Sequence, residues 1–201
     1  MGAINGRATY ICFNGDDFER PGGCVPHYVA AVAKNKNLQL VLSIGDQIDP
    51  KRIGPVPNNA IVVKRAPQLE LLKRATVCIT HAGLNTVLES LAQGVPQLAI
   101  PITYDQPGLA ARIAHKRTGV VTSLDKLTAD HLAFLLNEVL TDPTYRENAR
   151  KLQKAIAEAN GLSVAADFIE ESVGTSRKVR SSAGLITALG KNRPKPVASF
   201  N

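Results

Sequence analysis

Several features are scarce or missing in this 201-residue sequence, and each absence excludes a class of protein. It has no tryptophan, and aromatic residues make up only 4%. No apolar run approaches the roughly 20 residues of a membrane-spanning helix, and the first ten residues lack a secretory-signal pattern. The three cysteines are Cys12, Cys24 and Cys78, an odd number without a CxxC pair, so a disulfide framework and a cysteine zinc site are disfavoured. We therefore expect a cytoplasmic protein.

Acidic residues are missing from the end of the chain, and this explains the net charge of +7. From residue 175 onward there are six Lys or Arg residues and no acid, whereas residues 1–174 hold 18 basic and 17 acidic residues. We expect 175–201 to be a disordered basic tail. The pattern predicts no specific nucleic-acid partner and at most peripheral contact with a membrane. A nucleic-acid binder that acts through the tail remains an alternative.

What is present up to about residue 173 is an alternation of short apolar runs and amphipathic stretches. We predict strands over 9–13, 38–44, 60–63, 77–80, 97–100 and 120–122, and helices over 26–33, 68–73, 85–92, 106–116, 129–140 and 145–160. Apolar strands separated by helices are typical of a parallel sheet covered on both faces. The sequence therefore predicts an α/β, Rossmann-like doubly wound domain over residues 1–174.

The most informative segment is the turn that follows the predicted strand 77–80. It reads His81-Ala82-Gly83-Leu84-Asn85-Thr86 and leads into a helix that we expect to begin near Asn85. A helix N-terminus offers unpaired N–H groups and the positive end of its dipole, which suit a phosphate. Gly83 lets the backbone approach an anion closely. Asn85 and Thr86 either cap the helix or turn a donor toward the phosphate, to which His81 can also donate.

Polar residues at neighbouring positions extend this candidate site. Glu89 lies one turn further along the same helix face as Asn85, where a carboxylate acceptor suits the two hydroxyls of a ribose. Asp105 and Gln106 follow the next predicted strand, and Gln68 follows the strand 60–63. Because the carboxyl ends of parallel strands share one edge, we expect these three loops to form a single rim.

Each of these features alone has a plain structural interpretation. A capped helix after a strand explains the HxGxN pattern, an N-cap explains Asp105, and a surface acid explains Glu89. Only the combination of all three at these spacings favours a ligand site.

The segment 65–106 resembles the nucleotide-sugar signature of the UDP-glycosyltransferase superfamily, the family-1 glycosyltransferases with a GT-B fold. The segments HAGLNTVLES, GVPQLAIPI and DQPGLAARI are most similar to those of bacterial members such as zeaxanthin and macrolide glycosyltransferases. The likeness extends from about residue 38 to 173. It implies that the chain corresponds to the C-terminal, donor-binding half of a GT-B fold.

The resemblance also implies a role for each matching residue. Pro67 and Gln68 would frame the nucleobase and ribose, and His81 would contact the diphosphate. The remaining matches are Gly83, Asn85 and Thr86 for the phosphates, Glu89 for the ribose, and Asp105 and Gln106 for the donor hexose. Arg65 stands where many members carry an aromatic residue that stacks on the base, and a guanidinium can stack as well. These enzymes transfer the sugar with inversion and need neither a metal nor another cofactor. Consistent with that, the sequence has no DxD motif.

Two departures from the family pattern bear on activity. The region Phe13-Asn14-Gly15-Asp16-Asp17 replaces the usual Gly-Thr or Gly-Ser turn, and the segment 14–28 matches poorly. The general-base histidine of the family belongs to the other, amino-terminal domain. None of the four histidines here (His27, His81, His115 and His131) is a good candidate for it.

Two hypotheses follow. In the first, the chain is the donor-binding domain of a hexosyltransferase that uses a UDP- or dTDP-sugar and a hydroxyl of a small lipophilic acceptor. In the second, it is a truncated non-catalytic remnant, or a subunit that needs a separately encoded amino-terminal half. A dinucleotide oxidoreductase is disfavoured because no GxGxxG follows the first strand. The sequence does not identify the acceptor, the nucleotide or the hexose.

Overall fold

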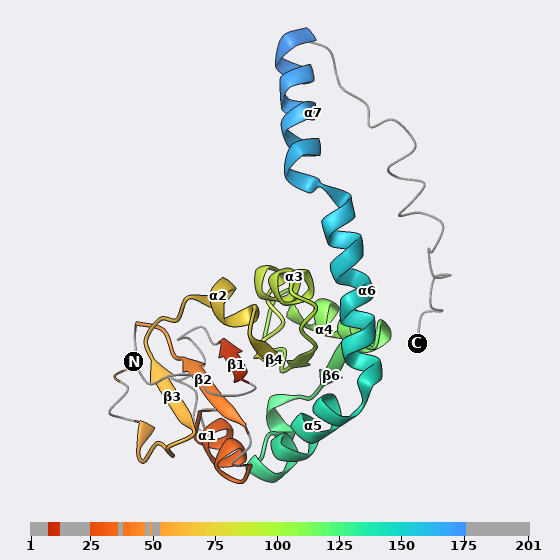
Figure 1. The fold of residues 1–201 in the computed structure, drawn as a ribbon. Helices are drawn as coiled ribbons and strands as arrows, with labels where there is room; N and C mark the ends of the chain where they lie inside the picture. Colours follow the sequence, from red (N-terminus) through yellow and green to blue (C-terminus); the bar gives the residue numbers. More distant parts are fainter. Residues whose placement is uncertain (1–7, 13–24, 36–37, 47–48, 50–52, 176–201) are drawn as a thin grey trace. The chain divides into compact units, whose positions relative to one another are not determined.

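Six parallel strands form one sheet in the computed structural model, which describes residues 8–12, 25–35, 38–46, 49 and 53–175 (Figure 1). The strands are β1 (Ala8–Cys12), β2 (Gln39–Ser43), β3 (Ala60–Val63), β4 (Ala75–Thr80), β5 (Gln97–Ala99) and β6 (Gly119–Val121). Their order across the sheet is β3-β2-β1-β4-β5-β6, and every neighbouring pair is parallel. The order reverses between β1 and β4, and in open α/β sheets ligands bind at the carboxyl ends of the strands beside such a reversal.

Helices connect the strands and follow the last of them. They are α1 (Val25–Ala33), α2 (Gln68–Leu72), α3 (Leu84–Ala92), α4 (Gln106–His115), the 3-10 turn η3 (Leu124–Lys126), α5 (Ala129–Thr141), α6 (Pro143–Ala159) and α7 (Gly161–Thr175). None of the helices in the described ranges is long and apolar enough to cross a membrane.

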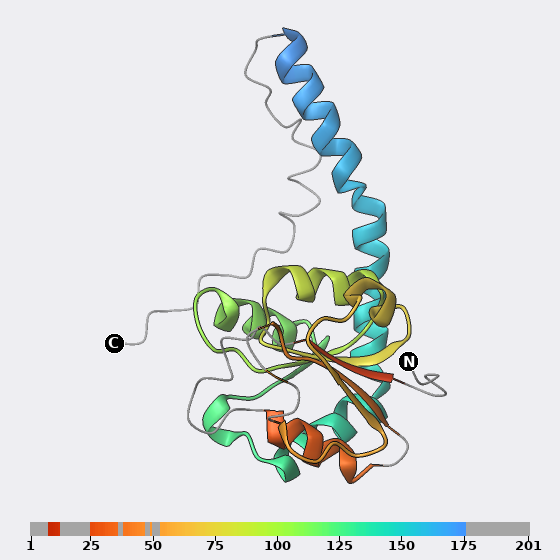
Figure 2. The ribbon, with the colours of Figure 1, turned by 90° about the vertical axis from the view of Figure 1, so that its left-hand side faces the viewer.

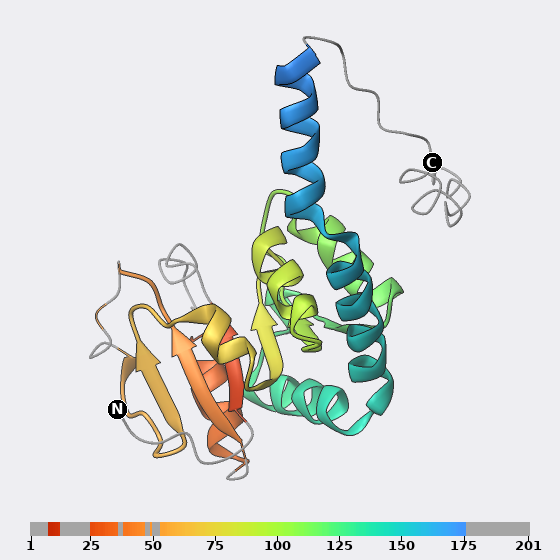
Figure 3. The same cartoon turned by 45° about the horizontal axis from the view of Figure 1, so that its top comes forward.

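Both faces of the sheet are covered, because successive side chains of a strand point to opposite faces. Leu42 and Ile79 pack with α1 and α5 on one face, in the largest apolar cluster. Val41 and Cys78 pack with α2 on the other face, where α3, α4 and α6 form a further cluster. Figure 2 shows the sheet edge-on between these helices, and Figure 3 shows β3, β2, β1 and β4 side by side. The doubly wound Rossmann-like prediction is confirmed.

Local signals explain several helix ends. Gly94 follows α3 with φ +64°, and the N–H of Val95 donates to the carbonyl oxygen of Ser90 (2.9 Å). This is the Schellman arrangement, which needs a residue in the left-handed conformation. At the start of α5, the hydroxyl of Thr128 accepts from the N–H of His131 (3.1 Å).

Each predicted strand and helix agrees with the structure within two residues at both ends. The strand 60–63 is β3 with the same bounds, whereas β4 begins at Ala75, two residues earlier than predicted. Helix α6 is displaced toward the amino end, from the predicted 145–160 to 143–159. Helix α7 was not predicted.

The chain divides into two compact units, residues 1–158 and 159–201. The first unit holds the sheet and the helices up to α6, whose last residue, Ala159, lies just past the boundary. Helix α7 lies in the second unit. The predicted basic tail lies outside the described residues apart from Thr175. Most of the divergent segment 14–28 also lies outside them.

Candidate functional site

The turn between β4 and α3 is the centre of the candidate site. Thr80 ends the strand, and Ala82 is fully buried with φ +66°. A left-handed conformation costs an L-residue about 1–2 kcal/mol. The backbone N–H of Ala82 donates to Thr80 Oγ1 (3.1 Å), which holds the turn in place. Strained backbone maintained by its surroundings is common at ligand sites.

The ring of His81 lies against Gly83 in this turn. A β-carbon added to Gly83 would lie 2.5 Å from His81 Nε2, so only glycine fits beneath the ring. His81 is 8% exposed, and its Nδ1 is buried with no hydrogen-bond partner among the described residues. A buried ring nitrogen without a partner is costly, and a ligand that reaches it would relieve that cost.

Burial also sets the protonation of this histidine. Desolvation lowers the pKa of His81 below its ordinary value of 6.5, and the charge of Asp105 raises it by a smaller amount. The imidazole is therefore neutral at neutral pH, with one nitrogen that donates and one that accepts. The N–H of Ile100 after β5 donates to the carbonyl oxygen of Thr80 (2.8 Å), so the β5–α4 loop starts beside the His81 turn.

Helix α3 begins without a side-chain cap. Its N-cap is Gly83, whose carbonyl oxygen accepts from the N–H of Val87 (3.0 Å). The sequence predicted a start near Asn85, with Asn85 and Thr86 either as caps or as donors toward a phosphate. The helix begins at Leu84, and neither residue caps it. The first N–H groups of α3 therefore receive no side-chain acceptor at the cap, which leaves the helix end suited to an anion.

Three of the predicted residues meet between α2 and α3. The side-chain amide of Gln68, the first residue of α2, donates to a carboxylate oxygen of Glu89. The same nitrogen lies 3.3 Å from the hydroxyl of Thr86. Thr86 is buried, Glu89 is half-buried, and Asn85 is exposed on the same helix. The sequence predicted a common rim for the loops that carry Gln68 and His81, and the direct contacts of Gln68 with Thr86 and Glu89 were not predicted.

The loop after β5 forms the other side of the rim. Asp105 is exposed and precedes α4 as its N-cap residue, but its side chain caps no N–H. The side-chain oxygen of Gln106 accepts from the N–H groups of Ile102 (2.8 Å) and Thr103 (3.0 Å). Gln106 thus fixes the loop through its oxygen, which leaves its NH₂ group as the donor for a ligand.

Arg65 has a partner that the sequence analysis missed. It follows β3 and forms an ion pair with Asp46, which follows β2, and both side chains are at least half exposed. The two loops are also joined by the N–H of Gly45, which donates to the carbonyl oxygen of Lys64 (2.9 Å). The position of Asp46 directly after a predicted strand could have indicated it, because that strand ends at the same edge.

No metal site is evident in the described part of the chain. It holds no group of three or more His, Cys, Asp or Glu side chains placed to bind a metal ion.

Known proteins with similar sequences are sugar transferases. The model of the family described as UDP-glucoronosyl and UDP-glucosyl transferase matches residues 29–158. An NDP-glycosyltransferase, YjiC, of Bacillus licheniformis is 33% identical over 144 residues, which is 72% of this chain and 36% of the relative. The zeaxanthin glucosyltransferase of Pantoea ananas is 38% identical over 129 residues, 64% of this chain and 30% of the relative.

Solved structures show the same relationship. The glycotransferase of kitacinnamycin matches with a TM-score of 0.76 and 27% identity, over 82% of this chain and 43% of that one. The glycosyltransferase VinC, solved in complex with dTDP, matches with a TM-score of 0.67 and 25% identity, over 78% of this chain and 39% of that one. The chain spans about a third of the length of the curated relatives it matches.

Proposed function

Because the chain belongs to the UDP-glucoronosyl and UDP-glucosyl transferase family, we propose that it is the donor-binding domain of a GT-B hexosyltransferase. The donor is a UDP- or dTDP-sugar, and the acceptor is a hydroxyl of a small lipophilic molecule. One observation carries the proposal: the His81 turn, the uncapped start of α3 and the Gln68–Glu89 pair lie together at the carboxyl edge of the sheet. In this proposal the chain corresponds to the C-terminal half of a GT-B fold.

The diphosphate of the donor would lie at the amino end of α3. The first N–H groups of the helix and its dipole favour the negative charge, and Gly83 allows close approach. Neutral His81 donates one ring N–H to a phosphate oxygen. These groups act most strongly on the leaving diphosphate, since its charge grows as the bond to the sugar breaks.

The nucleoside would extend from the phosphates toward α2 and β3. Glu89 accepts from the ribose hydroxyls, and the amide of Gln68 orients that carboxylate. Arg65, oriented by Asp46, offers its planar guanidinium to the face of the base, in place of the aromatic residue common in the family.

The hexose would lie on the other side of the phosphates, beside the β5–α4 loop. Asp105 accepts from sugar hydroxyls, and the NH₂ group of Gln106 donates to them. In the transfer step the acceptor oxygen bonds to the anomeric carbon while the carbon–oxygen bond to the diphosphate breaks, so the configuration inverts. The diphosphate takes the electron pair, and the acceptor proton goes to a base outside this chain.

In the second hypothesis the chain binds the nucleotide sugar at the same site but does not transfer the sugar by itself. Among the residues that the structure describes at the candidate site, the one histidine is His81, and the proposal assigns it to the phosphate and not to the general base. We therefore propose that transfer needs a separately encoded amino-terminal half, or that the chain is a non-catalytic remnant. We propose a cytoplasmic location, with no specific nucleic-acid partner and at most peripheral membrane contact.

Calorimetric titration of the full chain with UDP and with dTDP tests the site. We expect saturable, weak binding that EDTA leaves unchanged, since no metal is proposed. His81→Ala and Glu89→Ala should each abolish it, whereas Glu70→Ala, which removes an exposed carboxylate from α2, should not. If the folded wild-type chain binds neither nucleotide at millimolar concentration, or if both site variants bind like the wild type, the assigned site is wrong.

A mixing assay separates the two hypotheses about turnover. The chain is combined with the product of a neighbouring reading frame, and release of UDP from UDP-sugars is measured with candidate hydroxyl acceptors. Release that depends on both proteins supports the subunit hypothesis, and nucleotide binding without release supports the non-catalytic one.

A further inference from the structure

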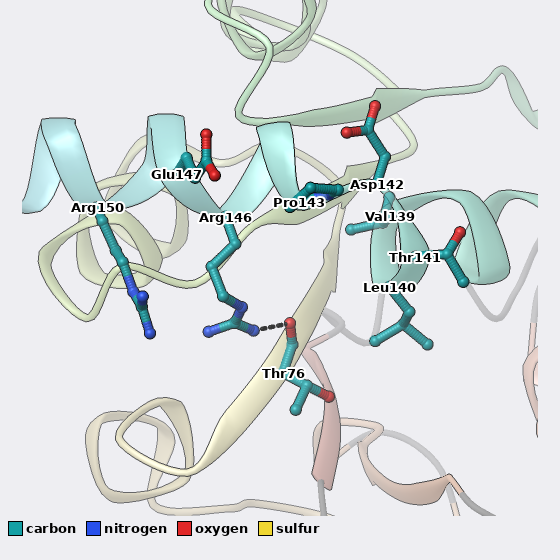
Figure 4. Close-up of a pocket in the computed structure, with 9 residues that line it drawn as sticks. All are labelled: Thr76, Val139, Leu140, Thr141, Asp142, Pro143, Arg146, Glu147 and Arg150. Carbon is teal, nitrogen blue, oxygen red and sulfur yellow. Dashed lines mark hydrogen bonds between the residues drawn. The ribbon is translucent and has the colours of Figure 1, made fainter.

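A cavity of about 440 Å³ lies at the amino end of β4, the opposite edge of the sheet from the candidate site (Figure 4). We call it the α5–α6 cavity, because the end of α5 and the first two turns of α6 form most of its wall. The lining includes Thr76, Val139, Leu140, Pro143, Arg146 and Arg150. None of the nine predicted donor-site residues belongs to it.

Two arginines of α6 extend into this cavity. Arg146 and Arg150 are four residues apart and therefore share one face of the helix. In Figure 4 their side chains run in the same direction, toward the start of β4. The guanidinium of Arg146 donates to the carbonyl oxygen of Thr76.

A local irregularity of β4 explains that contact. Ala8 and Thr9 of β1 pair with Ala75 and Val77, so Thr76 is an extra residue in the ladder. A bulged residue loses its regular pairing. Arg146 satisfies its carbonyl oxygen, and this anchors one guanidinium of the cavity in a fixed position.

Neither of the two carboxylates that line the cavity, Asp142 and Glu147, pairs with Arg146 or Arg150. Asp142 accepts from the N–H of Thr144 (2.8 Å) and pairs with Arg117 (3.3 Å). Glu147 is exposed, and Figure 4 shows its carboxylate on the opposite side of α6 from the guanidinium groups. Arg150 has no ion-pair partner among the residues that the structure describes, and its aliphatic stem packs near Gly94.

We propose that the α5–α6 cavity binds the phosphoryl group of a small organic phosphate between Arg146 and Arg150. Guanidinium groups present several N–H donors in a plane and match phosphate oxygens in pairs. The positive end of the α6 dipole lies at the same place. Val139, Leu140 and Pro143 supply an apolar wall, and the volume leaves room for an organic group beside the phosphate.

Phenyl phosphate is a suitable probe, since it combines a phosphoryl group with a small apolar part. The full chain is titrated with it, and binding is followed by NMR through the methyl groups of Val139 and Leu140. We expect saturable shifts at these methyls. Arg150→Gln should weaken binding by about tenfold or more, the effect of losing a charge-assisted hydrogen bond. Glutamine retains the part of the stem beside Gly94, so this variant should fold, whereas loss of Arg146 would release the Thr76 bulge.

A matched control is Lys151→Gln, which removes one positive charge from the next residue of α6. Lys151 is exposed and donates to Asn148, and this variant should bind like the wild type. His81→Ala should leave the phenyl phosphate titration at the Val139 and Leu140 methyls unchanged, so failure of the donor site and failure of this cavity are separate results. The proposal is overturned if the methyls show no saturable shift, if Arg150→Gln binds like the wild type, if Lys151→Gln is equally weakened, or if phenol binds as tightly as phenyl phosphate.

Discussion

Because Gly83 has no β-carbon, the His81 ring has room beside it in the candidate site. Its backbone conformation (φ −64°, ψ +139°) is open to any residue, so the glycine is required by space and not by strain. The space belongs to the His81 ring, whose Nε2 would lie 2.5 Å from an added β-carbon. A substitution here should therefore displace the histidine and little else.

The first prediction follows from this contact. Gly83→Ala should weaken UDP binding by about tenfold or more, the effect of one lost hydrogen bond to a charged group. Calorimetry measures it, and thermal unfolding shows whether the fold survives. Gly108→Ala is the control, because a β-carbon there meets only Arg112 Nη1 at 3.6 Å, an ordinary contact. Equal UDP affinity in the wild type and Gly83→Ala would contradict the packing of His81 on this glycine.

A second prediction concerns pH. Burial lowers the pKa of folded His81 below 6.5, so the unfolded chain binds this proton more readily than the folded one. The contribution of His81 to the free energy of unfolding is complete above pH 6.5 and is lost as the pH falls below that value.

Urea denaturation between pH 8 and pH 5 measures this effect. The decline in stability on acidification should be smaller in His81→Gln than in the wild type. His115→Gln, which replaces an exposed histidine at the end of α4, should keep the wild-type decline. If the decline is the same in His81→Gln, the histidine is not the group that titrates.

At the scale of elements, the backbones of β5 and β6 lie so close at Gly119 that no β-carbon fits between them. A β-carbon at Gly119 would overlap the carbonyl oxygen of Gln97, and both atoms belong to paired backbones that cannot move independently. Gly119→Ala should therefore separate the two strands and lower the free energy of unfolding by several kcal/mol, or prevent folding. Denaturant unfolding measures this, with Gly108→Ala again as the control. A midpoint like that of the wild type would show that the sheet adapts.

The start of α5 offers a milder test. Thr128→Ala removes the hydroxyl that accepts from the N–H of His131, and the cost of a lost N-cap is about 1 kcal/mol. Thr141→Ala serves as the control, since that exposed hydroxyl only bonds back to the carbonyl oxygen of Asn137 within the same helix. Urea unfolding of the two variants should differ by this amount, and equal stabilities would argue against the cap.

The elements were predictable where hydrophobic pattern and turn residues agree. The run 60–63 gave the bounds of β3, and Gly94 marked the end of α3. The pattern did not include Thr76 in β4, because this polar residue is a bulge whose carbonyl partner, Arg146, lies 70 residues further along the chain. Leu162, Ala165, Ile169 and Val173 recur at the three- to four-residue spacing of a helix, so the hydrophobic pattern could have indicated α7, although none of its described residues is buried.

The candidate site was predictable in outline for a similar reason. Parallel strands end at one edge, so the shared rim of the loops that carry Gln68, His81 and Asp105 followed from the topology. The choice of individual partners did not. Gln106 turns its oxygen to its own loop, a side-chain orientation that the sequence pattern does not indicate. The Arg65–Asp46 pair was missed, although both residues follow predicted strands that end at the same edge.

At the scale of the whole chain, the buried core defines a testable boundary. The residues buried in the described ranges extend no further than Ala149, and the boundary between the two compact units falls after residue 158. We expect a chain that ends at residue 158 to keep cooperative unfolding and UDP binding. Circular dichroism and calorimetry compare it with chains that end at 174 and 201. Loss of the fold in the shortest chain would instead favour the predicted domain boundary at residue 174.

The strand order has a consequence for how this protein acquires its structure. β1 precedes every other strand of the sheet in the chain, yet it lies between β2 and β4. One of its edges stays without a neighbour until residues 75–80 have been synthesised. Pairings between distant segments slow folding and leave an edge open to other chains in the meantime. The sheet that carries the candidate site therefore gains its central β1–β4 pairing only after β4 has been synthesised, and a nascent chain stalled before β4 should be prone to aggregate.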